Sequence, residues 1–245
     1  MSEAAKVALV TGAARRIGAA IARRLHAAGY RVALHAHGSR DELAALCAEL
    51  ERQTPGSTLA VHADLADTSA LPGLIEQSVA RFGRLDALVN NASNFFPTPL
   101  ATATPAQWDA LLAVNARAPF FLVQAAAPAL RASGGSIVNL TDAALAHPLA
   151  GHTAYTAAKG ALAALTAALA VELAPLVRVN AIAPGAILWP DAGKDAAAQA
   201  AVLARTPLGR TGSAEEVADA VRWLLDDATY LTGHTLMLDG GRTLA

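Results

Sequence analysis

Short apolar runs alternate with longer helical patterns from one end of the chain to the other. The short runs predict buried strands at 6–10, 31–37, 58–62, 85–89, 136–140 and 178–183, and a last strand with its turn at 235–241. Helical patterns lie between them, most clearly at 19–28, 108–130, 159–173 and 215–225. Alternating strands and helices form βαβ units that share one parallel sheet. The sequence therefore predicts an α/β fold, a doubly wound parallel sheet with helices on both faces.

Composition narrows the class of protein. Hydrophobic residues make up 54% of the chain and charged residues 16%, which is typical of a globular protein with a large core. The formal net charge is -1, so no overall field attracts nucleic acid or a membrane surface. Lys159, Thr166 and Glu172 interrupt the Ala/Leu-rich stretch 159–176, so we expect a buried core or interface helix there, and no membrane span.

Nothing in the sequence divides the chain. It has no linker, internal repeat or change of composition, so we expect residues 1–245 to form a single domain. The polar, Ala-rich segment around 188–210, with Trp189 near its start, is expected to be a mobile lid. Residues 1–5 do not resemble a signal peptide, so a cytoplasmic protein is expected. The single cysteine, Cys47, excludes an internal disulfide, and no zinc spacing is present.

A glycine-bearing loop, Thr11–Gly18, follows the first predicted strand and leads into the first predicted helix. Backbone N–H groups at a helix N-terminus, together with the helix dipole, favour an anion such as a phosphate. Gly12 permits a tight turn, and Gly18 permits close packing of the helix on the strand. This arrangement predicts a dinucleotide-binding loop. The simpler alternative is an ordinary connection between a strand and a helix.

The end of the second predicted strand indicates which dinucleotide is bound. In NAD-binding units an acidic residue there bonds the ribose hydroxyls. Here the segment carries His35, His37 and Ser39, and no carboxylate occurs before Asp41. Two cations lie in the neighbouring loop, Arg15 and Arg16. A phosphate on the ribose 2′-oxygen would meet cations and no repulsion, which favours NADP(H) as the cofactor.

Two other interpretations of this segment stay open. The stretch Ser39–Glu42 has the sequence of a capping box, so Ser39 could cap the next helix, bind phosphate, or do both. His35 and His37 could suggest a metal site, but no third ligand lies nearby in the sequence. No metal site is therefore predicted.

Polar residues also follow the third and fourth predicted strands. Asp64, just before Leu65, could bond the adenine amino group, or it could cap the segment that starts near Thr68. Asn90 and Asn91 end the fourth strand, where side-chain amides can tie a strand end to neighbouring backbone and line a ligand crevice.

Two aromatic residues, Phe95 and Phe96, occupy the next loop. In a chain with only 4% aromatic residues, they suggest a flat ligand. The simpler interpretation is that Phe96 fills a gap in the core and that Phe95 alone is functional. Farther on, Asn115 is a polar residue among apolar ones and needs buried partners, so it is either structural or part of a relay.

Tyr155 and Lys159 carry the strongest chemical signal. Positions i and i+4 share one face of a helix, so the phenol and the ammonium are expected to meet. A neighbouring cation would lower the pKa of the phenol toward neutrality, which suits proton transfer. Asp142 follows the fifth predicted strand, at the end where crevices form in open α/β sheets. The spacing of Tyr155 and Lys159 alone is common by chance, and the surrounding motifs give it weight.

Taken in order, these segments resemble the short-chain dehydrogenase/reductase family over essentially the full chain. The matching motifs are Thr11-Gly12…Gly18, Asn90-Asn91-Ala92, Asn115, Tyr155…Lys159 and Pro184-Gly185. The chain is similar in particular to the pteridine reductases, in Arg16 before Ile17-Gly18, His35-Ala36-His37 with Ser39, the stretch 91–100, and Asp142 where most of the family carries serine. The resemblance implies a Rossmann-type sheet that binds NADP(H) across its crevice.

The resemblance also implies roles for individual residues. Tyr155 would be the proton donor, and Lys159 would hold the nicotinamide ribose and tune Tyr155. Asn115 would maintain a relay to Lys159. Asp142 would replace the usual serine as partner of Tyr155, because a pteridine C=N bond needs a proton on nitrogen as hydride reaches carbon. Phe95 would stack on the pterin.

Other residues are implied in binding. The implied substrate contacts are Arg16, Ser93, Phe95, Asp142, His152, Tyr155 and Trp189. The implied cofactor contacts are Gly12, Arg15, Arg16, Ile17, Gly18, His35, His37, Ser39, Asp64, Leu65, Asn91, Ala92, Tyr155, Lys159, Pro184, Gly185 and Ile187. One departure concerns Gly38, which stands where trypanosomatid pteridine reductases carry an arginine that grips the 2′-phosphate. Here Arg40 follows instead.

The sequence therefore predicts an NADPH-dependent pteridine reductase, which converts a dihydropterin or dihydrofolate, and also an oxidised pterin, to the tetrahydro form. The resemblance further implies a homotetramer. One alternative is a reductase of ketone, sugar or acyl carbonyls, although the Asp142 carboxylate would repel a developing oxyanion unless it were protonated. Another is a non-catalytic dinucleotide-sensing protein, against which the intact Tyr155, Lys159 and Asn115 argue.

Overall fold

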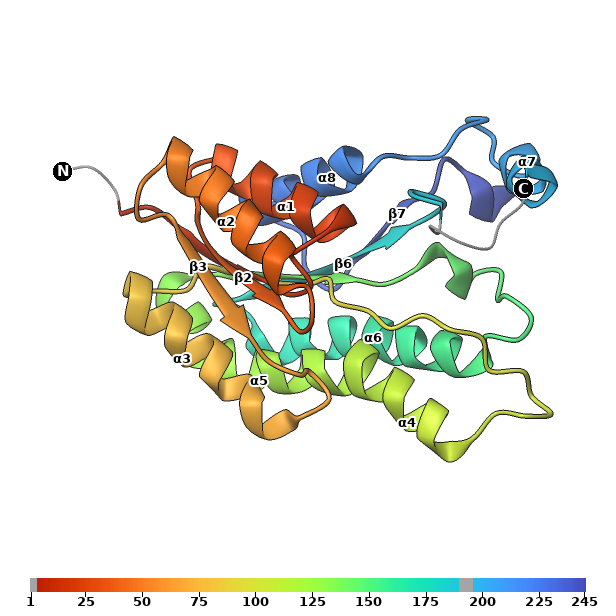
Figure 1. The fold of residues 1–245 in the computed structure, drawn as a ribbon, viewed down its shortest axis with the longest axis horizontal. Coiled ribbons are helices and arrows are strands. Elements are labelled where there is room, and N and C mark those ends of the chain that lie inside the picture. Colours follow the sequence, from red (N-terminus) through yellow and green to blue (C-terminus); the bar gives the residue numbers. More distant parts are fainter. Residues whose placement is uncertain (1–3, 190–195) are drawn as a thin grey trace.

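One parallel sheet runs through the centre of the molecule (Figure 1). The structure is a computed structural model that describes residues 4–189 and 196–245. Within these residues seven strands lie in the order β3-β2-β1-β4-β5-β6-β7, and every neighbouring pair is parallel. The strands are β1 (Val7–Val10), β2 (Arg31–Ala36), β3 (Thr58–His62), β4 (Ala87–Asn90), β5 (Ser136–Leu140), β6 (Arg178–Pro184) and β7 (Thr235–Leu238).

Helices cover both faces of this sheet (Figure 1). On one face lie α1 (Arg16–Ala27), α2 (Arg40–Gln53) and α8 (Ala214–Asp226). On the other lie α3 (Leu71–Phe82), α4 (Pro105–Leu112), α5 (Ala118–Ser133) and α6 (Thr153–Leu173). The short helix α7 (Ala196–Ala204) lies near the C-terminus. The predicted Rossmann-type, doubly wound α/β fold is confirmed.

The alternation of side chains along the strands divides the core into two layers. All four residues of β1 are buried. Ala8 and Val10 pack in the layer that contains α1 and α8, whereas Val7 and Leu9 pack in the layer that contains α3 and α5. A strand that is buried on both faces needs apolar residues at every position. This is why β1 appears in the sequence as an uninterrupted apolar run.

The helical region predicted at 108–130 is broken in the structure. Between α4 and α5 the chain forms a π-helical segment, Ala113–Arg117, which contains Asn115. Helix α1 begins at Arg16, three positions before the predicted start, so it takes in Gly18. By length and composition the stretches Pro105–Ser133 and Thr153–Leu173 are long enough to cross a membrane. Both cover one face of the sheet as core helices of this fold (Figure 1).

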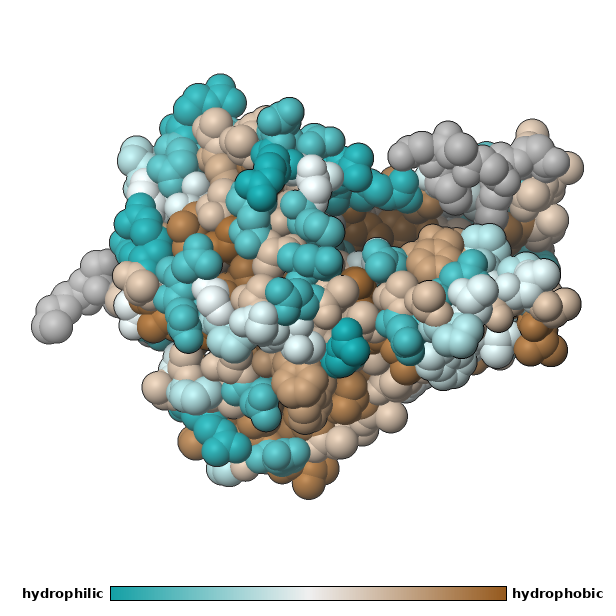
Figure 2. Space-filling model, turned by 60° about the horizontal axis from the view of Figure 1, so that its bottom comes forward, coloured by the Kyte–Doolittle hydropathy of each residue, from teal (hydrophilic) through white to brown (hydrophobic). Residues whose placement is uncertain are grey.

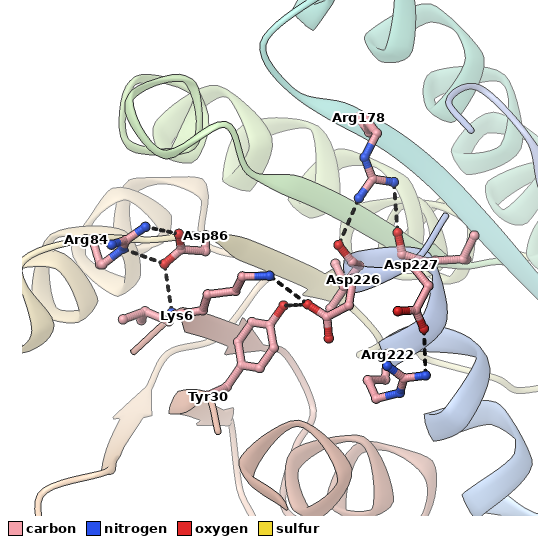
Figure 3. Close-up of polar contacts among 11 residues, drawn as sticks. Lys6, Tyr30, Arg84, Asp86, Arg178, Arg222, Asp226 and Asp227 are labelled. Atoms are coloured by element: carbon pink, nitrogen blue, oxygen red, sulfur yellow. Dashed lines mark hydrogen bonds and ion pairs between the residues drawn. The ribbon is translucent and has the colours of Figure 1, made fainter. Parts of the chain in front are cut away.

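Polar contacts tie the amino-terminal end of the sheet together (Figure 3). The buried Asp86 carboxylate accepts the backbone N–H of Val7 at 2.8 Å and pairs with Arg84 through two hydrogen bonds. Nearby, the hydroxyl of Tyr30 donates to Asp226 at the end of α8 at 2.7 Å. Burial, followed by this hydrogen bond, raises the pKa of Tyr30 above its usual value.

Arg178, at the start of β6, holds the carboxyl-terminal end of α8. Its guanidinium donates to the backbone carbonyls of Leu224 at 2.8 Å, Leu225 at 2.9 Å and Ala228 at 3.0 Å. The last carbonyls of a helix have no partners within the helix, so one arginine satisfies several of them at once. These contacts fix one end of the sheet and leave the loops at the other end to form the site.

Candidate active site

A cleft of about 610 Å³ opens at the carboxyl ends of the first four strands. It lies where the strand order reverses, because β1 pairs with both β2 and β4, and open α/β sheets bind ligands at such points. Thirteen of the predicted residues line it: Gly12, Arg15, Arg16, Ile17, Gly18, His35, His37, Ser39, Asp64, Leu65, Asn91, Ala92 and Ser93.

The glycine loop is locked against the end of β4. Thr11 Oγ1 accepts the backbone N–H groups of Asn91 at 2.9 Å and Ala92 at 3.1 Å, and Asn91 Nδ2 donates to the Thr11 carbonyl at 2.8 Å. Gly12 has a φ of +63°. A Cβ at Gly12 would lie 2.9 Å from Ala92 Cα, and a Cβ at Gly18 would collide with the Gly12 carbonyl. Both glycines are therefore required by close approach of the backbone.

The start of α1 suits an anion. Its N-cap residue, Arg15, makes no capping hydrogen bond with its side chain, and its first turn contains no acidic residue. A helix N-terminus of this kind, behind a glycine loop, presents N–H groups and a positive dipole end to a phosphate. The residues present thus fit a dinucleotide, whose phosphates the loop and the first turn of α1 would hold.

The two histidines at the end of β2 have different environments. The ring of His35 is buried, and its Nδ1 accepts the backbone N–H of Gly12 at 3.3 Å. Burial lowers the pKa of His35, so the ring is neutral near pH 7. His37 is exposed, and its Nδ1 lies 3.9 Å from an Asp64 carboxylate oxygen. The positive charge at this end of the cleft therefore comes from Arg15 and Arg16, and not from His35.

Two capping interpretations are wrong. Ser39 is the N-cap residue of α2, but its side chain makes no capping hydrogen bond. Asp64 does not cap the segment near Thr68; Asp67 does so by accepting the backbone N–H of Ser69 at 2.9 Å. The carboxylate of Asp64 instead accepts the N–H of Ala66 at 2.9 Å and borders the cleft.

Asp142 and Tyr155 meet beside the cleft. Asp142 follows β5, and Tyr155 lies in the first turn of α6. The hydroxyl of Tyr155 donates to Asp142 Oδ2 at 2.7 Å, while Asp142 Oδ1 accepts the backbone N–H of Ala144 at 2.7 Å. The second contact holds the carboxylate in place, so the pairing of Asp142 with Tyr155 is built into the fold.

The prediction that Lys159 lowers the pKa of Tyr155 is wrong for this structure. Burial raises the pKa of Tyr155, and the negative charge of Asp142 raises it further. The Lys159 ammonium donates to the Leu140 carbonyl at 2.7 Å and lies 6.0 Å from the centre of the Tyr155 ring. Burial lowers the pKa of Lys159 to about 8. Tyr155 is thus a protonated donor hydrogen-bonded to a carboxylate.

Asn115 has the buried partners that its position requires. Its Nδ2 donates to the carbonyls of Asn94 at 2.9 Å and Leu111 at 3.0 Å, and Ser93 Oγ donates to its Oδ1 at 2.7 Å. The π-helical segment that carries Asn115 is typical of functional positions in helices. Because Ser93 lines the cleft, Asn115 connects the wall of the cleft to the helix beneath it.

The two adjacent phenylalanines have different environments. Phe95 is 52% exposed. Its ring stacks on His152 with centroids 4.7 Å apart and meets the Tyr155 ring edge-on at 4.8 Å. Phe96 packs against the small core cluster that contains Leu111 and Tyr155. The interpretation that Phe96 fills a gap in the core is confirmed, and Phe95 is the ring that remains available to a ligand.

The remaining predicted residues follow β6. Pro184 is its last residue, and at Gly185 a Cβ would lie 2.7 Å from Asp239 Cα. Ile187 is buried. Arg16 Nη2 lies 3.5 Å from the Trp189 carbonyl. Of the predicted lid, residues 190–195 lie outside the described residues.

Some residues of the site were not predicted. The carbonyl of Asn94 accepts from Asn115, and the carbonyl of Ala63 faces the His35 ring at 3.1 Å. Backbone carbonyls leave no mark on a sequence pattern. Thr11 was predicted as part of the glycine loop, but the anchoring role of its hydroxyl was not; its place directly after an apolar strand was the available signal.

Comparison with known proteins identifies the family. A family model described as enoyl-(acyl carrier protein) reductase matches residues 12–243. The chain belongs to the short-chain dehydrogenase/reductase family and is an oxidoreductase of that type. Reductases of this family use nicotinamide dinucleotides, which agrees with the cleft described above.

Individual relatives differ in their substrates. The chain is 38% identical to pteridine reductase 1 of Leishmania tarentolae, over 99% of this chain and 98% of that protein. It is 36% identical to 3-oxoacyl-(acyl-carrier-protein) reductase FabG of Staphylococcus aureus, over 96% of this chain and 97% of that protein. It is 39% identical to L-xylulose reductase of Bos taurus, over 97% of this chain and 96% of that protein. Identity alone therefore does not separate a pterin from a carbonyl substrate, and the residues of the site must do so.

Proposed function

We propose that this protein is an NADPH-dependent pteridine reductase, which reduces a dihydropterin or dihydrofolate, and also an oxidised pterin, to the tetrahydro form. The observation that carries the proposal is the hydrogen bond of 2.7 Å from the Tyr155 hydroxyl to the Asp142 carboxylate. Phe95, which is 52% exposed, lies beside this pair, and its ring makes a T-shaped contact with the ring of Tyr155.

A carboxylate next to the proton donor suits a C=N bond better than a C=O bond. Reduction of a carbonyl develops negative charge on oxygen, and the Asp142 charge would oppose it. Reduction of a pteridine C=N bond places a proton on nitrogen as hydride reaches carbon. Tyr155 can give that proton, and Asp142 can accept a proton from water and return it to Tyr155. The raised pKa of Tyr155 keeps the donor protonated between turnovers.

Phe95 supports a flat aromatic substrate. Its ring stacks on His152 and makes a T-shaped contact with Tyr155, and the residue is 52% exposed, so part of it remains accessible to a ligand. Stacked aromatic rings prefer separations within about 4.5–7 Å, and the contact adds to the free energy of burial. A pterin ring would fill such a position, whereas a small aliphatic ketone would leave most of it unused.

The cofactor would occupy the cleft from the glycine loop to the end of β4. When bound, its nicotinamide supplies the hydride. Lys159 would hold the nicotinamide ribose, and Asn115 would keep the wall formed by Ser93 and Asn94 in place. Arg15, Arg16, His37 and Ser39 border the part of the cleft that would take a 2′-phosphate, which favours NADPH over NADH.

A carbonyl reductase is the second candidate. The similar identities to a 3-oxoacyl reductase and to L-xylulose reductase favour it. A third candidate is a protein that binds a dinucleotide without turnover. The presence of Tyr155, Lys159 and Asn115 together argues against it.

The test is to supply NADPH with dihydrobiopterin, with dihydrofolate and with a panel of ketones and sugars, and to identify the products by mass spectrometry. The proposal predicts that dihydrobiopterin and dihydrofolate each gain two hydrogens, and that the ketones are turned over little. Turnover of ketones alone would establish the second candidate. NADPH binding with no turnover of any substrate would establish the third.

A cytoplasmic homotetramer is also proposed, on family resemblance. Figure 2 shows apolar residues gathered on the lower part of the molecule, where the layer of α3–α6 is turned forward. In that layer Val171 on α6 is 81% exposed, and Leu176, just beyond α6, is 53% exposed. Apolar side chains so exposed on a core helix suit a subunit contact. Analytical ultracentrifugation would detect the tetramer, and a purely monomeric species would contradict it.

A further inference from the structure

His35 holds the glycine loop from the side opposite to Asn91. Two successive backbone N–H groups of the loop donate to this one residue. The N–H of Gly12 donates to the ring at Nδ1 at 3.3 Å, and the N–H of Ala13 donates to the His35 carbonyl at 2.8 Å. The other ring nitrogen, Nε2, lies 3.1 Å from the Ala63 carbonyl beyond β3. The ring thus bridges the ends of β1, β2 and β3.

These partners determine the protonation state of the ring. Nδ1 faces an N–H donor and must accept, while Nε2 faces a carbonyl and must donate. Only the neutral tautomer with its proton on Nε2 satisfies both contacts. Protonation would place an N–H at Nδ1 against the N–H of Gly12, and that contact would be lost. The ring is about 1% exposed, so water cannot replace the lost partner.

We propose that His35 is a positioning residue for the cofactor, which sets the Gly12–Ala13 turn of the phosphate-binding loop only while its ring is neutral, so that acidification loosens the loop and weakens dinucleotide binding. The inference rests on the proposed cofactor and not on the substrate. His35 thereby acts through the Gly12 backbone. Charge alone would lead one to expect that the protonated ring attracts a phosphate. Protonation instead weakens binding, because it breaks the contact between Nδ1 and the Gly12 N–H.

The surroundings of the ring favour the neutral form. Burial lowers the pKa of His35, the Ala63 carbonyl opposes this, and the nearby rings of His62 and His37 lower it further. Arg15, Arg16 and Asp64 are charged groups that line this end of the cleft, and Glu42 pairs with Arg15 at 3.7 Å. Because the 2′-phosphate itself changes charge between about pH 5.5 and about pH 8, and other ionisable side chains line the cleft, a pH effect must be assigned to His35 by substitution.

Two substitutions separate the two contacts of the ring. In His35→Asn the shorter side chain can still accept from the Gly12 N–H, but it cannot reach Ala63 and cannot gain a proton. In His35→Gln the longer side chain can still donate to the Ala63 carbonyl, but it offers no acceptor at the position of Nδ1. His26→Gln is the matched control, because His26 is also a buried histidine with a pKa lowered by burial, and its ring contacts Ser57 away from the cleft.

The experiment measures the Kd of NADPH and of NADH, without substrate, by cofactor fluorescence from about pH 8 to about pH 5.5, where a histidine changes charge. Circular dichroism at each pH establishes that every protein remains folded. On acidification we expect the Kd of the dinucleotide to rise in wild-type and His26→Gln protein by a factor about three- to tenfold larger than in His35→Asn. This difference corresponds to the loss of one hydrogen bond. At about pH 8 we expect His35→Asn to bind near wild-type strength, with His35→Gln about three- to tenfold weaker.

Equal pH dependence of wild-type and His35→Asn protein would overturn the inference, as would a His35→Asn variant that binds no better than His35→Gln at high pH. If His35→Asn fails to fold, the comparison of wild-type with His35→Gln remains decisive, since equal affinity at high pH contradicts a role through Gly12. Failure of wild-type protein to bind either dinucleotide would instead refute the proposed cofactor.

Discussion

Asparagine at position 142 would test the proton relay with the least structural disturbance. Asp142 makes two contacts, one to the hydroxyl of Tyr155 and one to the backbone N–H of Ala144. The second contact caps a short 3₁₀ turn, Ala143–Leu145. Alanine would remove both contacts, whereas asparagine keeps an oxygen for the cap and removes the negative charge and the site for the proton.

The expected magnitudes follow from these contacts. Losing an N-cap side chain costs about 1 kcal/mol of stability, so Asp142→Ala should be less stable than wild-type protein and Asp142→Asn should not be. Losing a positioned acid–base group costs about 10²- to 10⁴-fold in rate. We therefore expect kcat for a dihydropterin to fall by that factor in both variants. The Kd of NADPH should change by less than about threefold, since Asp142 lies outside the residues that line the cleft.

The assay follows NADPH absorbance under saturating dihydropterin, with Tyr155→Phe and the double variant Asp142→Asn/Tyr155→Phe measured beside it. Because the two residues act as one unit, the double variant should be no slower than Tyr155→Phe alone. A kcat for Asp142→Asn within about threefold of wild type would refute the relay. If the losses of kcat in the two single variants multiply in the double variant, the two residues act independently.

Further predictions concern other parts of the molecule. Phe95→Ala should raise the KM for a dihydropterin by about two- to tenfold and leave the Kd of NADPH unchanged, since one stacked aromatic contact is lost; an unchanged KM would place Phe95 outside the substrate site. Gly38→Arg should raise the NADPH-to-NADH preference in kcat/KM, because a Cβ at Gly38 meets nothing within 4 Å and the new guanidinium can reach the 2′-phosphate; a lower preference would contradict the assignment of that end of the cleft. Lys159 is an ammonium below its lowered pKa of about 8 and neutral above it, so kcat should fall as pH rises through that value; a profile flat to about pH 10 would show that its charge is not needed. Arg178→Ala should lower the free energy of unfolding by about 3 kcal/mol in urea, because several helix-end carbonyls lose their donor, whereas Arg222→Ala at an exposed ion pair should cost less than about 1 kcal/mol; equal costs would contradict this account of the α8 terminus.

The fold could be predicted because the central strands β1, β4 and β5 are buried on both faces. Runs such as Val7–Val10 contain no polar residue, and β–α alternation then leaves few topologies open. The residues of the cleft could be predicted for a related reason. In a parallel sheet the loops after successive strands meet at one edge, so Gly12, His35, Asp64 and Asn91 are brought together by topology alone.

Local side-chain contacts were less predictable. Thr104 and Ser213 form complete capping boxes at the starts of α4 and α8, but Ser39, in the same sequence pattern, forms none. The capping-box sequence shows which side chains could form the cap. It does not show the backbone conformation of the N-cap residue, on which the capping hydrogen bond depends. Asn115 was recognised as an unusual polar residue, but the π-helical segment around it departs from the 3.6-residue period on which the prediction was based.

Electrostatics was the least predictable part of the site. The spacing of Tyr155 and Lys159 indicated a neighbouring cation and hence a lowered pKa of the phenol. The structure adds burial and the Asp142 carboxylate, and both act in the opposite direction. Similarly, the sequence did not show the role of His35. Burial lowers the pKa of its ring, and the ring forms a neutral hydrogen-bonding bridge between Gly12 and Ala63, which lies far along the chain. Such effects depend on the sum of surrounding groups, and a short motif contains only one or two of them.

The most direct measurement of the central claim compares kcat/KM for dihydrobiopterin with kcat/KM for the best ketone or sugar, in wild-type protein with saturating NADPH. If Asp142 and Phe95 define a pteridine site, the ratio should favour the pterin by at least about a hundredfold. A carbonyl substrate would lose both the acid–base contribution of Asp142 and the stacking contact with Phe95, and the two losses multiply. A ratio that favours the carbonyl substrate would contradict the account and would make this protein a carbonyl reductase.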